Sequence, residues 1–166
     1  EYIDSLVDLI VVLGPTASGK TRYAVQLAGE INACAALGLF EGCPGRMTDP
    51  APVNGAEIIS ADSRQVYKGM DIGTGKDLAE YGDIPYHLID ILPAGAQYNV
   101  FRFQQDFRRV WADIRSRGMV PILCGGTGMY INAVTAGYDF TSKVSLSAGR
   151  GPSEAEGLPR HPYFIG

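Results

Sequence analysis

An apolar run followed at once by a glycine-rich loop is the feature that most constrains the fold of this chain. The run from Leu9 to Leu13 leads directly into GPTASGKT, residues 14–21, which matches the pattern G-x-x-x-x-G-K-[ST] at every fixed position. In this context the pattern predicts a buried strand, a phosphate-binding loop and a helix in succession. Such a loop turns backbone N–H groups inward around an anion, and the helix directs its positive end at the same point. The sequence therefore predicts a binding site for a di- or triphosphate.

The loop also supplies a positive charge and a candidate metal ligand. Lys20 adds a mobile cation, and the Thr21 hydroxyl is placed to ligate Mg²⁺. The predicted phosphate-binding residues are Gly14, Pro15, Thr16, Ala17, Ser18, Gly19, Lys20 and Thr21. The loop alone does not say which phosphate compound is bound, because kinases, NTPases and some diphosphate-using transferases share it.

Strands and helices alternate along the chain. This order predicts an α/β fold, a P-loop NTPase-like parallel sheet with helices on both faces. Ligands in such sheets bind beyond the carboxyl ends of the strands. Residues 14–21, 61–65 and 125–128 each follow a predicted strand, so we expect them to border one crevice. The predicted strands are 8–13, 57–60, 86–92 and 120–124, and the predicted helices are 20–31, 101–117 and 129–136.

Two segments depart from this regular alternation. Residues 33–55 are rich in glycine and proline and have no sustained period, so they are predicted to be a loop-like insertion within a core of residues 1–140. Residues 141–166 also lack periodicity and are predicted to form an irregular tail.

Composition narrows the class of protein. A length of 166 residues fits one domain, and a net charge of −4 argues against broad binding to polyanions, although a small local patch could still contact RNA. The longest apolar run is too short to span a bilayer, and no signal peptide precedes it. Three cysteines, an odd number, fit a reducing compartment and not a disulfide framework. The expectation is a cytoplasmic, monomeric protein without a membrane partner.

Two acidic residues at predicted strand ends are candidates for chemistry. Asp62 follows the second predicted strand, where a carboxylate can act as a base near the phosphates; it or Ser63 could instead cap a helical turn. Asp90 could support Mg²⁺, orient a loop or simply occupy a turn at the end of a strand. The aromatic residues of the 101–117 helix are expected to be core, because they recur at helical spacing.

Four sequence blocks, in order, carry a resemblance to a known family. They are GPTASGKT, ISADSRQVYKGMDIGTGK, PYHLIDI and GGTGMY, and they cover most of residues 7–137. Together they resemble the tRNA dimethylallyltransferase (isopentenyltransferase) family. In that family the loop holds the diphosphate of dimethylallyl diphosphate, and the prenyl group passes to the exocyclic amine of an adenosine next to the tRNA anticodon.

The resemblance implies roles for individual residues. Asp62 would be the general base, and Lys20 and Thr127 would join it as catalytic residues, with Mg²⁺ as cofactor. Residues 62–65 (Asp62, Ser63, Arg64 and Gln65) and Thr127 would contact the tRNA. The resemblance stops near Phe140, whereas family members continue, so the core is expected to be truncated and its activity impaired.

Three alternatives remain open from the sequence. The first is transfer of the prenyl group to free adenylate (AMP, ADP or ATP), as relatives that make cytokinins do. The second is a P-loop small-molecule kinase. Such a kinase would be expected to have an arginine-rich lid in the region of residues 125–130, where this chain has no arginine. The third is a remnant that binds phosphate compounds without turnover.

Overall fold

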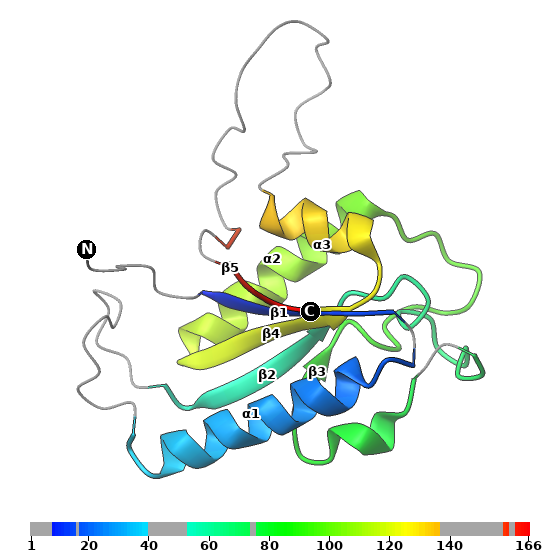
Figure 1. Cartoon of the computed structure of the whole chain (residues 1–166). Helices are drawn as coiled ribbons and strands as arrows, with labels where there is room; N and C mark the ends of the chain where they lie inside the picture. Colours follow the sequence, from blue (N-terminus) through cyan, green and yellow to red (C-terminus); the bar gives the residue numbers. More distant parts are fainter. Residues whose placement is uncertain (1–7, 16, 40–52, 74–75, 137–157, 160–161) are drawn as a thin grey trace, which may run out of the picture.

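A five-stranded parallel sheet forms the centre of the molecule (Figure 1). The computed structural model describes residues 8–15, 17–39, 53–73, 76–136, 158–159 and 162–166. The strand order is β3-β2-β4-β1-β5, which places β4 between β2 and β1. The predicted α/β fold with a parallel sheet is confirmed. The strands are β1 Leu9–Leu13, β2 Gly55–Ser60, β3 Tyr86–His87, β4 Met119–Gly125 and β5 Pro162–Ile165.

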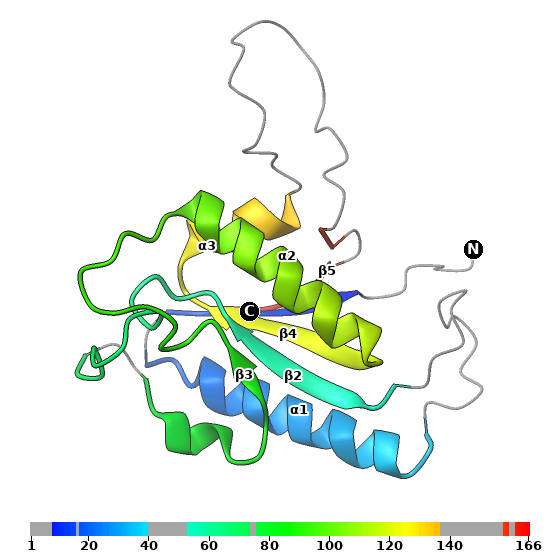
Figure 2. The same cartoon turned by 180° about the vertical axis from the view of Figure 1, so that it is seen from behind.

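Helices cover both faces of this sheet, as predicted (Figures 1 and 2). Helix α1, Lys20–Ala36, and the short 3₁₀ helix η1, Leu78–Tyr81, lie on one face. Helices α2, Val100–Ser116, and α3, Gly128–Thr135, lie together on the other. Within the described ranges, none of the helices has both the length and the apolar character that a membrane span requires.

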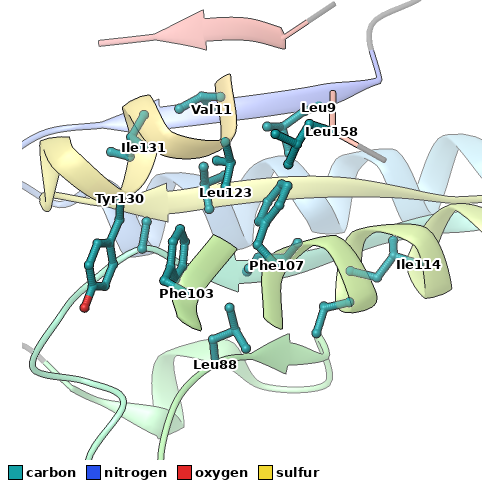
Figure 3. Close-up of a cluster of buried hydrophobic side chains, with 14 residues drawn as sticks. Leu9, Val11, Leu88, Phe103, Phe107, Ile114, Leu123, Tyr130, Ile131 and Leu158 are labelled. Atoms are coloured by element: carbon teal, nitrogen blue, oxygen red, sulfur yellow. The ribbon is translucent and has the colours of Figure 1, made fainter. Parts of the chain in front are cut away.

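Neighbouring side chains of each strand alternate between two apolar cores. Ile58 of β2 packs in the core that contains α1, whereas the next residue, Ile59, packs in the core formed with α2 and α3. Figure 3 shows this second core, in which Phe103 and Phe107 project from α2 toward the sheet. The Phe103 ring stacks on that of Tyr130, with centroids 4.4 Å apart. The aromatic residues of α2 are therefore core, as predicted.

Two elements differ in length from the sequence prediction. Helix α1 continues five residues past the expected end at Ile31, because the alanine-rich residues 32–36 extend it before Gly38 adopts a φ of 68°. The predicted insertion at 33–55 thus begins as helix, and its residues 40–52 lie outside the described residues. Strand β3 has two residues and not seven, because Leu88 and Asp90 have φ angles of 63° and 55° and cannot continue a strand.

The tail also corrects the sequence prediction at its end. Residues 162–166, expected to be irregular, include β5, which pairs in parallel with β1 in the register Leu9↔Pro162 to Val12↔Ile165. The strand is short and its aromatic side chains are exposed, 57% for Tyr163 and 50% for Phe164, so no apolar alternation marked it in the sequence. Residues 141–157 of the predicted tail lie outside the described residues.

Candidate active site

Three loops meet at the carboxyl ends of β1, β2 and β4. Because β4 lies between the other two strands, the loop after it touches both neighbours. A Cβ added to Gly125 would lie 2.3 Å from the Ala61 carbonyl oxygen, and one added to Gly126 would lie 3.0 Å from the Gly14 carbonyl oxygen. Glycine at these two positions lets the three backbones pack directly together. The structure thus brings the three loops together as predicted, but only residues of 14–21 and 61–65 are among those that line the cavity described below.

Hydrogen bonds fasten the loop after β4 to the loop after β2. The Thr127 backbone N–H donates to the Ala61 carbonyl oxygen at 3.2 Å. The Thr127 hydroxyl oxygen accepts in return from the Ser63 N–H at 3.1 Å. Thr127 therefore holds the turn that carries Asp62, and its predicted catalytic and tRNA-binding roles stay predictions.

The predicted phosphate-binding loop closes on itself. The Lys20 ammonium donates to the Pro15 carbonyl oxygen at 2.9 Å, and the Ser18 N–H donates to the same oxygen at 3.3 Å. Ala17 and Gly19 have φ angles of 61° and 82°, which turn the backbone sharply into α1. Thr16, also predicted to bind phosphate, lies outside the described residues. The loop thus has the shape expected of an anion cradle whose lysine is held over it.

A cavity of about 590 Å³ lies beside this loop. Lys20, which follows β1, and Asp62, which follows β2, both line this cavity, so the ammonium and the carboxylate face the same space. Its lining residues are Ala17, Gly19, Lys20, Thr21, Arg22, Asp62, Gln65, Asp71, Gly73, Lys76, Asp77 and Glu80. A second cavity of about 370 Å³ is lined by Gly14, Pro15 and Ser18 of the loop and by Ile165 at the end of β5.

Asp62 is nearly buried and well positioned by its own turn. It is 7% exposed, and its Oδ1 accepts from the Arg64 N–H at 2.8 Å, with the Arg64 Nε 3.9 Å away. Among the described residues, Oδ2 accepts no hydrogen bond. The sequence left open whether Asp62 or Ser63 would cap a helical turn; Asp62 makes this contact, and residues 63–66 form a turn and not a helix. One carboxylate oxygen thus fixes the side chain while the other is available to a substrate.

The Thr21 hydroxyl lies beside two buried groups. These are the Tyr81 phenol and the Cys124 thiol, and the nearby Thr21 hydroxyl lowers the pKa of each against the opposing effect of burial. Burial raises the pKa of Cys124 to about 11, so this thiol is protonated near neutral pH. Lys20 lowers that pKa and Asp62 raises it, so both charges act on the same sulfur at the end of β4. The Lys20 ammonium and the Asp62 carboxylate therefore both lie close enough to this thiol to shift its pKa.

The donor set around Thr21 fits a magnesium ion. Mg²⁺ takes oxygen ligands, typically one or two from the protein together with substrate phosphates and water. The Thr21 hydroxyl and the carboxylate of Asp62 line the same cavity. These oxygens, with those of a bound diphosphate, are of the kind that the ion prefers.

Lys76 is a functional candidate that the sequence analysis missed. Its side chain is 1% exposed, and its ammonium donates to the Tyr67 carbonyl oxygen at 2.8 Å, to Asp71 at 3.1 Å and to Asp90 at 2.5 Å. Burial opposes the charge, but the hydrogen bonds to Asp90 and Asp71 outweigh it and raise the pKa of Lys76. This one cation therefore joins Asp71, which lines the cavity with it, to Tyr67 and Asp90 behind the cavity lining.

Asp90 accordingly orients a loop, one of the roles considered for it. Besides pairing with Lys76, its backbone N–H donates to the Gln65 carbonyl oxygen at 3.0 Å. Gln65 is 8% exposed, and its Oε1 accepts from the Ser60 hydroxyl at 3.0 Å. Asp90 is absent from the residues that line the cavity beside Lys20, so the structure gives no support to its suggested role toward Mg²⁺.

Comparison with known proteins agrees with this geometry. Residues 65–158, more than half of the chain, match the family model described as IPP transferase. The chain belongs to this family. Two similar relatives are tRNA dimethylallyltransferase 1 of Geotalea uraniireducens and tRNA dimethylallyltransferase 2 of Shewanella sediminis, each 53% identical over 133 residues. Both alignments cover 80% of this chain but only 36% of the relative. The chain thus spans about a third of the length of these IPP transferase relatives.

Solved structures give the same family and fold. The tRNA delta(2)-isopentenylpyrophosphate transferase of Staphylococcus epidermidis is 40% identical with a TM-score of 0.62, covering 80% of this chain and 36% of that one. A eukaryotic dimethylallyltransferase, described as acting on tRNA, is 29% identical with a TM-score of 0.63 and covers 84% and 30%. The P-loop NTPase-like fold predicted from the sequence is thereby confirmed for the IPP transferase core.

Proposed function

We propose that this chain carries the catalytic core that transfers a dimethylallyl group from dimethylallyl diphosphate to the exocyclic amine of an adenosine next to a tRNA anticodon. One observation carries the proposal: the anion-binding loop with Lys20 and the nearly buried Asp62 line a single cavity of about 590 Å³. A transfer between an allylic diphosphate and an amine needs a cation for the leaving group and a base for the amine. The cavity offers both from adjacent loops.

The reaction follows from these two groups. The adenosine nitrogen attacks C1 of the dimethylallyl group, the C1–O bond breaks, and the diphosphate leaves with the electron pair. Asp62 accepts the proton that the amine loses, because its free oxygen is available while Oδ1 stays fixed by the Arg64 N–H. Lys20 and the loop N–H groups stabilise the charge that develops on the diphosphate.

Magnesium completes the anion site in this proposal. The Thr21 hydroxyl would hold the ion together with the diphosphate oxygens and water, which leaves the free oxygen of Asp62 to act as the base. A bound Mg²⁺ neutralises charge on the leaving group. Asp62 and Gln65, which line the cavity, are proposed to meet the tRNA together with Ser63, Arg64 and Thr127, which lie beyond its lining residues. We further propose that the protein is cytoplasmic and monomeric.

Labelled dimethylallyl diphosphate tests the proposal. The 166-residue chain is incubated with it, Mg²⁺ and either tRNA or AMP, beside the variants Asp62→Asn and Asp83→Asn. Asparagine at 62 can still accept from the Arg64 N–H but cannot take a proton, so transfer should fall about 10²- to 10⁴-fold while pyrophosphate binding persists. Asp83 is an exposed carboxylate outside the cavity, and its variant should match the wild type.

The acceptor separates the competing functions. Label in tRNA that depends on Asp62 supports the proposal, and label in AMP would indicate the adenylate transferase instead. Consumption of ATP with a small acceptor would indicate a kinase. Pyrophosphate binding without any transfer would leave a phosphate-binding remnant and contradict the proposed activity.

A further inference from the structure

One apolar side chain stands wholly in solvent at the edge of the cavity. Ile72 is 100% exposed, whereas the next most exposed of the large apolar residues in the described ranges, Leu37, is 74% exposed. Single exposed apolar residues are common on protein surfaces. Ile72 differs because its neighbours on both sides, Asp71 and Gly73, line the cavity that holds Asp62 and Lys20. Ile72 itself is not among the lining residues, so its exposed side chain lies beside the candidate active site and outside the cavity.

The backbone that carries Ile72 is anchored on both sides. Before it, the Asp71 carboxylate accepts from the buried Lys76 ammonium at 3.1 Å. After it, the Gly73 carbonyl oxygen accepts from the Arg64 guanidinium at 3.5 Å. Gly69 and Gly73 have φ angles of 76° and 75°, which allow the sharp turns at the ends of the segment. The exposure of Ile72 is thus set by a fastened loop.

The surroundings of Ile72 favour a nucleic acid over a protein partner. Protein-binding patches are contiguous apolar areas. Here the flanking Asp71 side chain is 65% exposed and charged, and the Arg64 guanidinium, 50% exposed, lies against Gly73. Apolar side chains such as isoleucine part stacked base steps in DNA, and arginine contacts phosphates, so Ile72 beside Arg64 offers both kinds of contact to a nucleic acid.

We propose that Ile72 is a wedge that enters the base stack of the RNA beside the extruded adenosine, with Arg64 on a neighbouring phosphate. This inference rests on the proposed function, because only a substrate base that enters the cavity must leave its stack. Extrusion leaves a gap between the neighbouring bases, and unstacking costs free energy. An apolar side chain that fills the gap offsets part of that cost and keeps the adenosine beside Asp62.

Fluorescence of an anticodon stem-loop RNA with 2-aminopurine at the target position tests the wedge, because this base brightens when it unstacks. The complete chain with pyrophosphate and Mg²⁺ should raise the fluorescence. Ile72→Ala should weaken the extrusion equilibrium about fivefold or more, the scale expected for losing the burial of an aliphatic side chain. Ile72→Leu should retain the signal. Leu37→Ala removes an exposed aliphatic side chain at the far end of α1 and should behave as the wild type.

The outcomes separate this inference from the proposed function. An undiminished fluorescence signal in Ile72→Ala overturns the wedge, and so does a wild type that binds the RNA without any increase in fluorescence. Either result would indicate that Ile72 contacts a protein partner instead. If the wild type still transfers label from dimethylallyl diphosphate in those cases, the proposed function stands. If the wild type extrudes the base through Ile72 but transfers no label, the wedge stands and the proposed transfer fails.

Discussion

At the scale of single residues, Lys76 is predicted to hold the cavity wall together. In Lys76→Met, the Tyr67 carbonyl oxygen loses its buried donor, and Asp90 loses its cation. A buried polar group left without its partner costs about 1–3 kcal/mol, so the free energy of unfolding should fall by that amount. Urea unfolding followed by tryptophan fluorescence measures the change.

Two variants serve as controls for Lys76. Lys68→Met removes an exposed lysine from the same segment and should change the free energy of unfolding by no more than about 0.5 kcal/mol. The double variant Lys76→Met with Asp90→Asn should lose less than the sum of its single changes, because the two groups are partners. If Lys76→Met were as stable as the wild type, the three contacts of this ammonium would make no net contribution to the free energy of unfolding.

Residues of the site were predictable from the sequence only where a local pattern carries the chemistry. The loop of residues 14–21 was found because its fixed spacing encodes its own shape, and Asp62 because it directly follows a strand. Lys76 was missed because its partners lie 5 and 9 positions away in the same long connection and 14 positions away after β3, and no local spacing links them. The available signal was a lysine in a glycine-rich segment that has aspartates nearby in the chain.

At the scale of elements, a buried carboxylate ties two strands to a helix. Glu57 of β2 is 3% exposed and pairs with Arg117, which follows α2, at 2.9 Å. Its other partner is the His87 ring of β3, with Nε2 2.6 Å from the carboxylate. The hydrogen bond to Arg117 lowers the pKa of Glu57; burial opposes this, and His87 adds to it. His87 is thus a structural residue that helps to join β3 to β2.

This lowered pKa makes stability depend on pH in the acid range. A carboxyl group whose pKa is lower in the folded state stabilises the fold above its unfolded pKa, near 4.5, and loses that contribution as pH falls through the folded value. We therefore expect the free energy of unfolding to decline below about pH 4.5. In Glu57→Gln the decline should be shallower. Thermal unfolding between pH 3 and 7 checks the slope, and an equally steep decline in Glu57→Gln would contradict this account.

Elements were predictable where apolar periodicity was strong. Strands β1 and β4 and helix α2 were found within two residues because they bury whole faces. The errors fall where backbone conformation decides, as at Leu88 and Asp90, whose positive φ angles end β3 after His87. Helix α1 is longer than predicted. Residues 33–36 are compatible with a helix, but they were assigned to the loop because of the glycines and prolines that follow them.

At the scale of the whole molecule, the sheet order brings the site together. Alternating strands and helices predicted a parallel sheet, but nothing local in the sequence predicts that β4 lies between β1 and β2. That placement brings Gly125 against Ala61 and Gly126 against Gly14, and so joins the anion cradle to the turn of Asp62. Topology thus explains the two glycines that open the short pattern GGTG, Gly125 and Gly126.

The outer strand β5 completes this arrangement and gives a prediction for the molecule as a whole. Because β1 pairs with β4 on one side and β5 on the other, deleting residues 162–166 should expose the edge of β1. In a parallel strand, alternate residues direct their backbone groups to opposite neighbours, so about half of the β1 amides should exchange faster. Hydrogen exchange of a peptide spanning Leu9 to Leu13 measures this effect, while a peptide spanning β2, buried between β3 and β4, should be unaffected. Tyr163→Thr changes an exposed side chain but keeps the backbone pairing, so its exchange should match the wild type. Unchanged exchange in β1 after the deletion would show that β5 gives this edge no protection.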